Sequence, residues 1–310
     1  MSTLGGPLDL ALGLSLVTLG SLAYAYSFES IASAVGLDQG RAGAVVSPLL
    51  TSLPELAVLL AAVVGVGGEQ GLEVGEGTVI GEPLVISTLS TPFVLLASGW
   101  LRVERSVARY YMAFLALFPF VLAPPALSNH PLARTAVAVT LLAFYVAFSA
   151  SGHGEEAIPA PRTRARPATL VLAASIASFT FGSRELVEGV LWASGPLGLP
   201  PFSVASLLVP SVTALPETGA AAVWARRGLG TMAASALVGE QVLYATVYPA
   251  VALLVAPWPF TSASITAVIV TEAAMAITAI GVWRGKLGRA QAAWGLVLVI
   301  IYASSLALAR

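Results

Sequence analysis

Two short segments of this chain repeat the same threonine, proline and glutamate residues. Residues 47–56 read SPLLTSLPEL and residues 209–218 read VPSVTALPET. Five residues recur at an offset of 162 positions, so that Pro48, Thr51, Leu53, Pro54 and Glu55 correspond to Pro210, Thr213, Leu215, Pro216 and Glu217. In both segments the glutamate follows the threonine by four positions, which places the hydroxyl and the carboxylate on one face of a helix. Such a face offers oxygen ligands to a cation.

A second glutamate follows in each half of the chain. Residues 79–82 read VIGE and residues 237–240 read LVGE, at an offset of 158. The glycine before each glutamate allows another helix to approach closely. Oxygen-rich sites suit hard cations such as Ca²⁺, whereas Zn²⁺ and copper prefer nitrogen and sulfur ligands. We therefore predict a metal cation site formed by Glu55, Glu217, Glu82 and Glu240, with further oxygens from Thr51, Ser52 and Thr213.

The prolines of the repeated segments should interrupt the helices that carry them. A proline lacks the backbone donor and clashes with the preceding turn, so nearby carbonyl groups lose their helical partners. Inside a membrane these carbonyls must be satisfied by neighbours, by water or by a bound cation. We expect helix breaks at Pro48, Pro54, Pro210 and Pro216.

The composition indicates that these segments lie inside a membrane. Charged residues make up 10% of the 310 positions, hydrophobic residues 57%, and the mean hydropathy is +0.88. Because a soluble domain carries about 25% charged residues, the exterior of this protein should face the lipid bilayer. The net charge of −1 offers no basic face to a nucleic-acid partner. The chain has no cysteine and only two histidines, His130 and His153, so no cofactor is predicted besides the cations themselves.

A helix needs about 20 mostly apolar residues to cross the hydrocarbon core. The sequence contains ten such stretches, at about 7–27, 42–66, 77–98, 107–125, 133–150, 168–193, 203–225, 231–255, 262–283 and 290–308. The polar linker 151–167 separates a first half, 1–150, from a second half, 168–310; the repeated regions are about 42–98 and 203–255. Five spans per half is an odd number, so the halves should be inverted. We predict an all-α polytopic membrane protein made of two inverted five-helix repeats, a plan typical of secondary transporters.

Basic residues predict the orientation, because they accumulate in cytoplasmic loops. The loops opposite the termini hold twelve of the fifteen basic residues: Arg41, Arg102, Arg105, Arg109, Arg162, Arg164, Arg166, Arg226, Arg227, Arg284, Lys286 and Arg289. The terminal side holds Arg134 and Arg310. Both termini are therefore predicted to be extracellular, in a multi-pass protein of the cell membrane.

Other acidic residues have simpler interpretations. We expect a solvated loop on the terminal side at Glu69, Glu73 and Glu76. An ion-pair cluster at the outer end of the bundle is expected at Arg184, Glu185 and Glu188. Glu272 lies in the middle of a predicted span and is expected to pair within the bundle.

The runs TSLPE at 51–55 and TALPE at 213–217 resemble the two α-repeat signatures of the sodium/calcium exchanger family, within the calcium/cation antiporter superfamily. The usual signature reads Gly-Thr-Ser-Leu-Pro-Glu. Segments 29–46 and 185–208, together with Gly288, Arg289 and Tyr302, also look like this family, as in a diverged prokaryotic-type member. The resemblance implies exchange of Ca²⁺ for Na⁺ or H⁺ by alternating access. By position, it implies ligand roles for Glu55, Glu217, Thr51, Ser52 and Thr213.

The chain departs from the family pattern at both motifs of each half. Leu50 and Val212 replace the signature glycine. Where the family usually has Ser-Asn, this chain has Glu82-Pro83 and Glu240-Gln241, and Ile86 and Tyr244 stand where the family places an Asn or Asp ligand. Because residues four apart share a helix face, the second pair of glutamates could replace the lost ligands from one turn away.

These observations favour a secondary antiporter that exchanges Ca²⁺, or a similar hard divalent cation, for Na⁺ or H⁺ at a site near the middle of the membrane. The doubled glutamates leave open a monovalent cation/H⁺ exchanger on the same fold. A non-transporting membrane receptor or scaffold is a further class. An enzyme is not predicted, because neither His130 nor His153 lies inside a predicted span, where an intramembrane protease would need a histidine.

Overall fold

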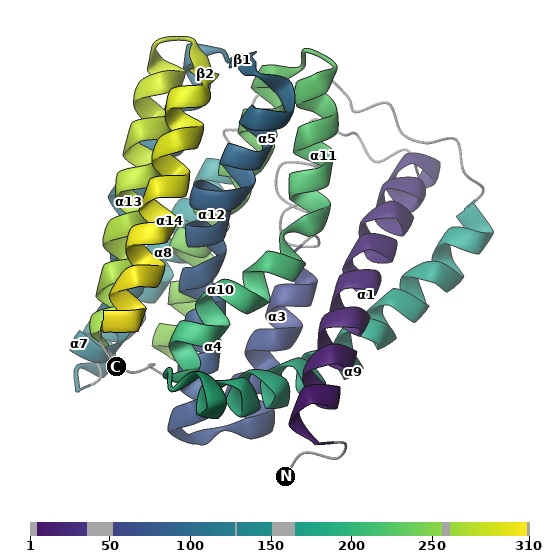
Figure 1. The fold of residues 1–310 in the computed structure, drawn as a ribbon, viewed down its shortest axis with the longest axis vertical. Helices are drawn as coiled ribbons and strands as arrows, with labels where there is room; N and C mark the ends of the chain where they lie inside the picture. Colours follow the sequence, from purple (N-terminus) through teal and green to yellow (C-terminus); the bar gives the residue numbers. More distant parts are fainter. Residues whose placement is uncertain (1–4, 36–51, 128, 151–164, 256–260, 309–310) are drawn as a thin grey trace.

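The fold is helical almost throughout (Figure 1). The structure is a computed structural model, and it describes residues 5–35, 52–127, 129–150, 165–255 and 261–308 of the chain. The elements of the first half are α1 (Gly6–Val35), α3 (Leu53–Leu60), a π-helical segment (Ala61–Val66), α4 (Gly68–Val85), a π-helical turn (Ile86–Ser90), α5 (Thr91–Ser98), β1 (Trp100–Arg102), a 3-10 turn (Arg105–Val107), α6 (Ala108–Leu117), a second 3-10 turn (Phe118–Leu122), α7 (Ala123–Ala126) and α8 (Pro131–Ala150). Those of the second half are α9 (Ala165–Leu197), α10 (Pro201–Thr213), α11 (Leu215–Arg226), α12 (Gly230–Leu254), α13 (Ser262–Trp283), β2 (Lys286–Gly288) and α14 (Arg289–Leu308).

Seven helices in the described ranges are long and apolar enough to cross a membrane: Gly6–Tyr24, Gly68–Ser98, Pro131–Ser149, Ala168–Leu197, Gly230–Leu254, Ser262–Trp283 and Arg289–Leu308. The other predicted stretches fall on shorter helical segments, among them Leu53–Val66 and Pro201–Thr213. The all-α polytopic class is confirmed. The count of ten spans stays a prediction, and the first part of the stretch at 42–66 lies outside the described residues.

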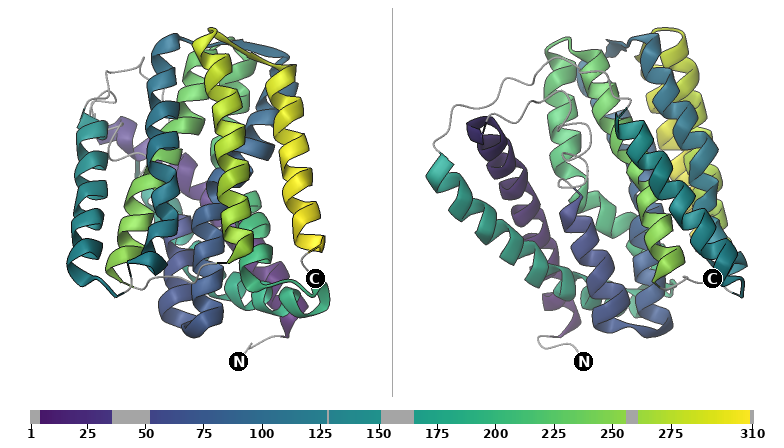
Figure 2. Two further views of the ribbon diagram at one scale, coloured as in Figure 1. Left: turned by 90° about the vertical axis from the view of Figure 1, so that its left-hand side faces the viewer. Right: turned by 180° about the vertical axis from the view of Figure 1, so that it is seen from behind.

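Corresponding helices of the two halves run in opposite directions. α1 and α9 lie side by side (Figures 1 and 2), with Gly13 against the backbone of Leu186 and Gly20 against Phe179. As the chain advances along α1 it therefore meets earlier residues of α9, so the two helices are antiparallel. A Cβ atom on Gly13 would collide with the Leu186 backbone, so glycine is needed for this approach. α4 and α12 are opposed as well, because the strand that follows α5 meets Gly230 at the start of α12.

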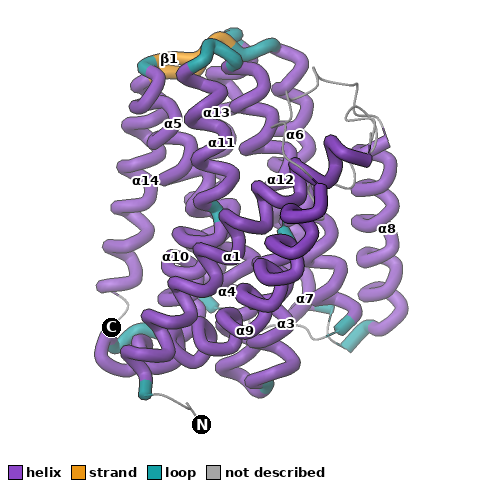
Figure 3. Tube along the Cα trace, turned by 90° about the vertical axis from the view of Figure 1, so that its right-hand side faces the viewer, coloured by secondary structure: helices purple, strands orange, loops and turns teal. Residues whose placement is uncertain are grey.

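The basic loops that the structure describes gather at one end of the bundle. β1 and β2 pair antiparallel there, with Leu101 opposite Leu287, and so join the loop after α5 to the loop after α13 (Figure 3). The backbone N–H of Glu104 donates to Thr231 Oγ1 at 3.1 Å, which ties the start of α12 to the same end. α1 begins and α14 ends at the other end (Figure 1). We call these the loop end and the terminal end.

The bundle is apolar outside and carries acids inside. Large apolar side chains such as Leu132, Phe181 and Ile300 are exposed, as expected for a surface that faces lipid. The buried acidic residues of the described ranges are Asp9, Glu55, Glu76, Glu82 and Glu240. Acids in the interior of a membrane protein are costly unless they are paired, protonated or hydrated, and they commonly mark functional sites.

The expectation of a solvated loop at Glu69, Glu73 and Glu76 is wrong, because all three residues lie on α4 and Glu76 is buried. α4 begins at Gly68, well before the predicted start at 77, and Glu76 lies inside it with no exposed surface. Glycines made this segment look like a loop, but they serve close packing, because a Cβ on Gly77 would lie 2.7 Å from the Phe202 carbonyl oxygen of α10. Glu69 is exposed and Glu73 is half-buried.

The orientation of the termini can be tested with single cysteines at Ser2 and Ser151 of this cysteine-free chain. An impermeant thiol reagent applied to intact cells should label Ser2→Cys and spare Ser151→Cys, because the basic loops favour the cytoplasm. Permeabilised cells, in which both positions should react, provide the control. Labelling of Ser151→Cys alone in intact cells would reverse the predicted topology.

Candidate functional site

The repeated segment of the second half forms a helix interruption in the interior of the bundle. α10 ends at Thr213 and α11 begins at Leu215, with Ala214 between them at φ −76° and ψ 1°. The N–H of Ala214 donates to the Pro210 carbonyl oxygen at 3.0 Å, so the path is interrupted without a loss of hydrogen bonding at this residue. Pro216 and Glu217 lie in the first turn of α11. The carboxylate of Glu217 is thus at the positive end of a helix dipole.

The matching segment of the first half has the same local design. α3 begins at Leu53, immediately after Ser52, and carries Pro54 and Glu55 in its first turn. The side chain of Glu55 is only 1% exposed. Tyr248 of α12 donates its hydroxyl proton to the Ser52 carbonyl oxygen at 3.0 Å, which fixes the start of α3 against the second half. Pro48 and Thr51 lie outside the described residues.

Glu82 lies where α4 and α10 touch. A Cβ on Gly81 would collide with the backbone of Ser206, so the glycine allows α10 to pack directly on α4. The next residue, Glu82, accepts a hydrogen bond at Oε2 from Thr213 Oγ1 at 3.1 Å. Pro83 and the π-helical turn Ile86–Ser90 follow, and π-helical turns are frequent at functional sites.

The structure brings the four predicted glutamates together around Thr213. Glu55 interacts electrostatically with Glu82 and Glu217, and Glu82 interacts with Glu217 and Glu240. Thr213 contacts both Glu55 and Glu82. These residues come from α3, α4, α10, α11 and α12, so both halves contribute.

Negative charge is concentrated at this place. Glu55 and Glu82 are 1% exposed and Glu240 is 6% exposed, while Glu217 is half-buried. Among the described residues, the charged groups that act on Glu55 and Glu82 are other glutamates, not lysines or arginines. Oε2 of Glu55 and Oε2 of Glu217 have no hydrogen-bond partner there. Buried like charges require counter-charges, which here must be protons or cations.

The carboxylates do not form a finished metal cage. Within the part of the chain that the structure describes, no group of three or more acidic or histidine side chains is arranged to hold a metal ion. A cation bound here would therefore need hydroxyl or carbonyl oxygens beside the carboxylates, or a small approach of the carboxylates towards one another.

α12 contributes three polar side chains that the sequence analysis did not assign to the site. Tyr244 is fully buried, stacks on Tyr248 with ring centroids 4.5 Å apart, and faces Glu55, Glu82 and Glu240. Its hydroxyl has no hydrogen-bond partner among the described residues, and neither has either amide atom of the fully buried Gln241. The available signal was their spacing: Gln241, Tyr244 and Tyr248 follow Glu240 at one, four and eight positions.

The remaining acids lie apart from this cluster. Glu272 of α13 is not among the groups that act on Glu55 or Glu82, and its Oε1 has no partner in the described ranges, so the expected pairing is not seen. Glu185 of α9 faces Arg184 and Glu188, as predicted, and also faces Asp9 of α1, a fully buried acid that the sequence analysis missed.

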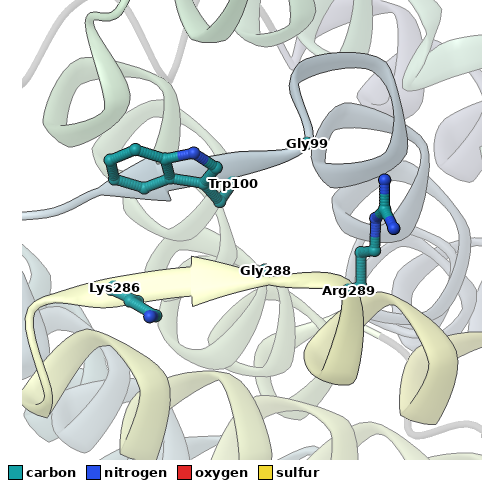
Figure 4. Close-up of a pocket in the computed structure, with 5 residues that line it drawn as sticks. All are labelled: Gly99, Trp100, Lys286, Gly288 and Arg289. Atoms are coloured by element: carbon teal, nitrogen blue, oxygen red, sulfur yellow. The ribbon is translucent and has the colours of Figure 1, made fainter.

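A pocket of about 450 Å³ opens at the loop end, beside the two strands (Figure 4). Its lining consists of Gly99, Trp100, Lys286, Gly288 and Arg289. The charged side chains of this lining are cationic and would repel a metal ion.

The chain was compared with known protein families and structures. A family model described as sodium/calcium exchanger protein matches residues 6–151 and 167–309. No curated protein matches the chain in sequence.

Several solved structures share the fold. An H⁺/Ca²⁺ exchanger, CAX, is 18% identical with a TM-score of 0.72, over 96% of this chain and 81% of that one. Native YfkE is 15% identical with a TM-score of 0.75, over 97% and 92%. The sodium-calcium exchanger NCX_Mj is 21% identical with a TM-score of 0.62, over 97% and 98%. At these identities the likeness shows the fold alone.

The contact between Thr213 and Glu82 can be tested by cation binding. Thr213→Val removes the hydroxyl but keeps the shape, and we expect the apparent Ca²⁺ affinity to fall roughly tenfold, because a hydrogen bond to a charged group is lost. The Ca²⁺-dependent rise in the unfolding temperature of the purified protein measures this change. Ser211→Ala, at an exposed position of the same helix, is the control. Equal Ca²⁺ responses in wild type and Thr213→Val would remove Thr213 from the site.

Proposed function

The chain belongs to the sodium/calcium exchanger family, and we propose that it exchanges Ca²⁺, or a similar hard divalent cation, for Na⁺ or H⁺ by alternating access. The family consists of membrane transporters and not of enzymes. One observation carries the proposal: four glutamates from the two inverted halves meet around Thr213, and among the described residues the charged groups that act on Glu55 and Glu82 are other glutamates.

The chemistry of the cluster supports a hard cation as cargo. Ca²⁺ takes about six to eight oxygen ligands in flexible geometry, and carboxylates, hydroxyls and backbone carbonyls can all serve. Ser52, Thr213 and the Tyr244 hydroxyl add oxygens to those of the glutamates. We propose Glu55, Glu217, Glu82 and Glu240 as the ligands of the transported ion, with Thr51 as a further ligand.

The arrangement also supports a coupling between binding and movement. Carboxylates that repel one another without a cation are drawn together when a cation binds, so the ion stabilises a more closed arrangement of the helices that carry them. α3 and α11 start at the cluster and run to opposite ends of the bundle, so the site belongs equally to both halves. A site between inverted repeats can be opened to either side by related movements. We propose a position near the middle of the cell membrane, with both termini extracellular.

A second candidate function is exchange of a monovalent cation for H⁺. It is favoured by Glu82 and Glu240, which bring the cluster to four carboxylates, whereas one Ca²⁺ neutralises only two charges. Uptake of Ca²⁺, Na⁺ and K⁺ into vesicles with imposed Na⁺ or H⁺ gradients separates the two functions. Ca²⁺ uptake driven by either gradient supports the first, and Na⁺ or K⁺ uptake driven by H⁺ without Ca²⁺ movement supports the second.

We expect Glu55→Gln and Glu217→Gln each to abolish exchange while the protein remains folded in the membrane. Glutamine keeps the size of the side chain but removes the charge that binds the cation. Exchange is measured by uptake into reconstituted vesicles, and Glu104→Gln in an exposed loop is the matched control. Substantial exchange by either site variant would refute its assignment as a ligand.

We also expect the double variant Glu82→Ser, Glu240→Ser to show a weaker pH dependence of Ca²⁺ affinity than the wild type. Protons and Ca²⁺ compete for the same carboxylates, so acidification should lower the affinity, and fewer acids should make this loss less steep. The affinity is measured in vesicles with equal pH on both sides, across about pH 5 to 8. Identical curves would mean that these glutamates do not belong to the proton-binding part of the site.

A further inference from the structure

Glu76 is a buried acid that the proposed exchange does not use. It has no exposed surface, and neither of its carboxylate oxygens has a hydrogen-bond partner among the described residues. It precedes Glu82 by six positions on α4, about 9 Å along the helix axis. An ionised carboxylate in this position would be strongly unfavourable, because a buried charge needs a counter-charge or hydrogen bonds.

The hydroxyl of Ser264 on α13 lies beside this carboxyl, but the carbonyl and hydroxyl oxygens of Thr261 compete for its one proton. Ser264 Oγ gives its proton to the Thr261 carbonyl oxygen at 2.9 Å and accepts the N–H of Thr261 at 2.9 Å. The N–H of Ser264 is taken as well, because Thr261 Oγ1 accepts it at 3.1 Å, so this N–H of the first turn of α13 is not available. Thr261 Oγ1 also lies 2.9 Å from Ser264 Oγ, and either hydroxyl can be the donor between them, so the hydrogen bonds of Ser264 are shared with Thr261.

The hydroxyl of Tyr302 on α14 also has another hydrogen-bond partner. It also faces Glu76 and makes a 2.7 Å hydrogen bond with Ser206 Oγ. Ser206 Oγ also bonds the Ser203 carbonyl oxygen at 3.0 Å, and either hydroxyl can be the donor between Ser206 and Tyr302. Both hydroxyls near Glu76 thus have other hydrogen-bond partners, and a buried carboxylate without a counter-charge is strongly unfavourable.

A row of acids leads from the surface to this group. Glu69 is exposed and Glu73 is half-buried, and with Glu76 they occupy one face of α4 at spacings of four and three residues. Glu73 accepts the N–H of Phe202 at 3.5 Å. In the described ranges, the titratable groups that face Glu76 are Glu73 on its own helix and Tyr302 on α14, while α10 and α13 present hydroxyls.

This row exists in one half of the molecule only. The offset of 158 that relates Glu82 to Glu240 places Thr231 at the position of Glu73 and a buried alanine, Ala234, at that of Glu76. Because the halves are inverted, the loop end has no equivalent of Glu76 at the related position. Any role of Glu76 is therefore confined to the terminal end of the bundle.

We propose that Glu76 is a proton-binding site separate from the four central glutamates. It exchanges protons with the solution at the terminal end, past Glu73 and Glu69. Its charge then changes the affinity for cations that enter from that side. Proton binding stands on the burial and hydrogen bonding of Glu76 itself, and the effect on cation binding rests on the proposed function. When Glu76 loses its proton, a negative charge appears near Glu82 and attracts cations. Raising the pH at the terminal end alone should therefore increase Ca²⁺ affinity from that side by about three- to tenfold.

The test compares wild type, Glu76→Gln, Glu76→Asp and Glu69→Gln. Infrared difference spectra across a pH titration should show a protonated carboxyl band in wild type that titrates and that is missing in Glu76→Gln. Ca²⁺ uptake into vesicles of sorted orientation, with pH varied on one side only, should lose its response to terminal-side pH in Glu76→Gln and keep its response to loop-side pH. Glu69→Gln, at the exposed end of the row, should retain the band and most of the response.

Every outcome of this test either supports or overturns a part of the proposal. Loss of both the band and the terminal-side response in Glu76→Gln supports the proposal, and loss of the band alone keeps the proton site but removes its effect on transport. The same titrating band in wild type and Glu76→Gln overturns the proton site, and so does a carboxyl band of Glu76 that never titrates.

If Glu76→Gln does not fold, Glu76→Asp serves: it should keep a titrating band with a shifted midpoint, and an unshifted band would overturn the assignment. The infrared result holds even if the transported ions differ from those proposed.

Discussion

Several carboxylates share the interior of a bundle whose outside faces lipid, and the structure has to accommodate their negative charge. Glu55, Glu82 and Glu240 are buried, and the charged neighbours of the first two are other glutamates. Direct pairing with arginine would neutralise them permanently and leave nothing for a cation to do. The basic residues of the described loops gather instead at one end and leave the interior negative.

Small residues allow several helices to pack closely around this interior. Gly77 and Gly81 allow α10 to lie on α4, and this contact places Thr213 within hydrogen-bonding distance of Glu82. The interruption at Ala214 is followed by a new helix, α11, whose first turn carries Glu217 beside the same cluster. A larger residue at Gly81 would move α10 away and would separate Thr213 from Glu82, so packing and chemistry depend on the same backbone contact.

Much of the architecture could be predicted from the sequence, because hydropathy reports directly on lipid exposure. The predicted stretch 262–283 matches α13 at both ends, and the repeated Thr-x-Leu-Pro-Glu segment led to the residues that meet at the cluster. The start of α4 was missed because glycine and glutamate between 68 and 76 suggest a loop, while the neighbouring helices that bury them are far away in sequence. Tyr244 was noted only as a departure from the family pattern, since no local feature tells that its ring turns towards three glutamates.

The two halves differ at several positions that the repeat relates, so their internal symmetry is not exact. Ala214 stands where the first half has Ser52, and Tyr244 stands where it has Ile86. Tyr244 faces three of the glutamates, whereas Ile86 at the related position carries no hydroxyl, so one half offers an oxygen that the other lacks. Inverted halves would present the same ligands to both faces of the membrane if their sequences were identical. Because they are not identical, a cation bound at the proposed site would meet a different order of oxygens from each end, and the two directions of exchange would then differ in affinity while using one site.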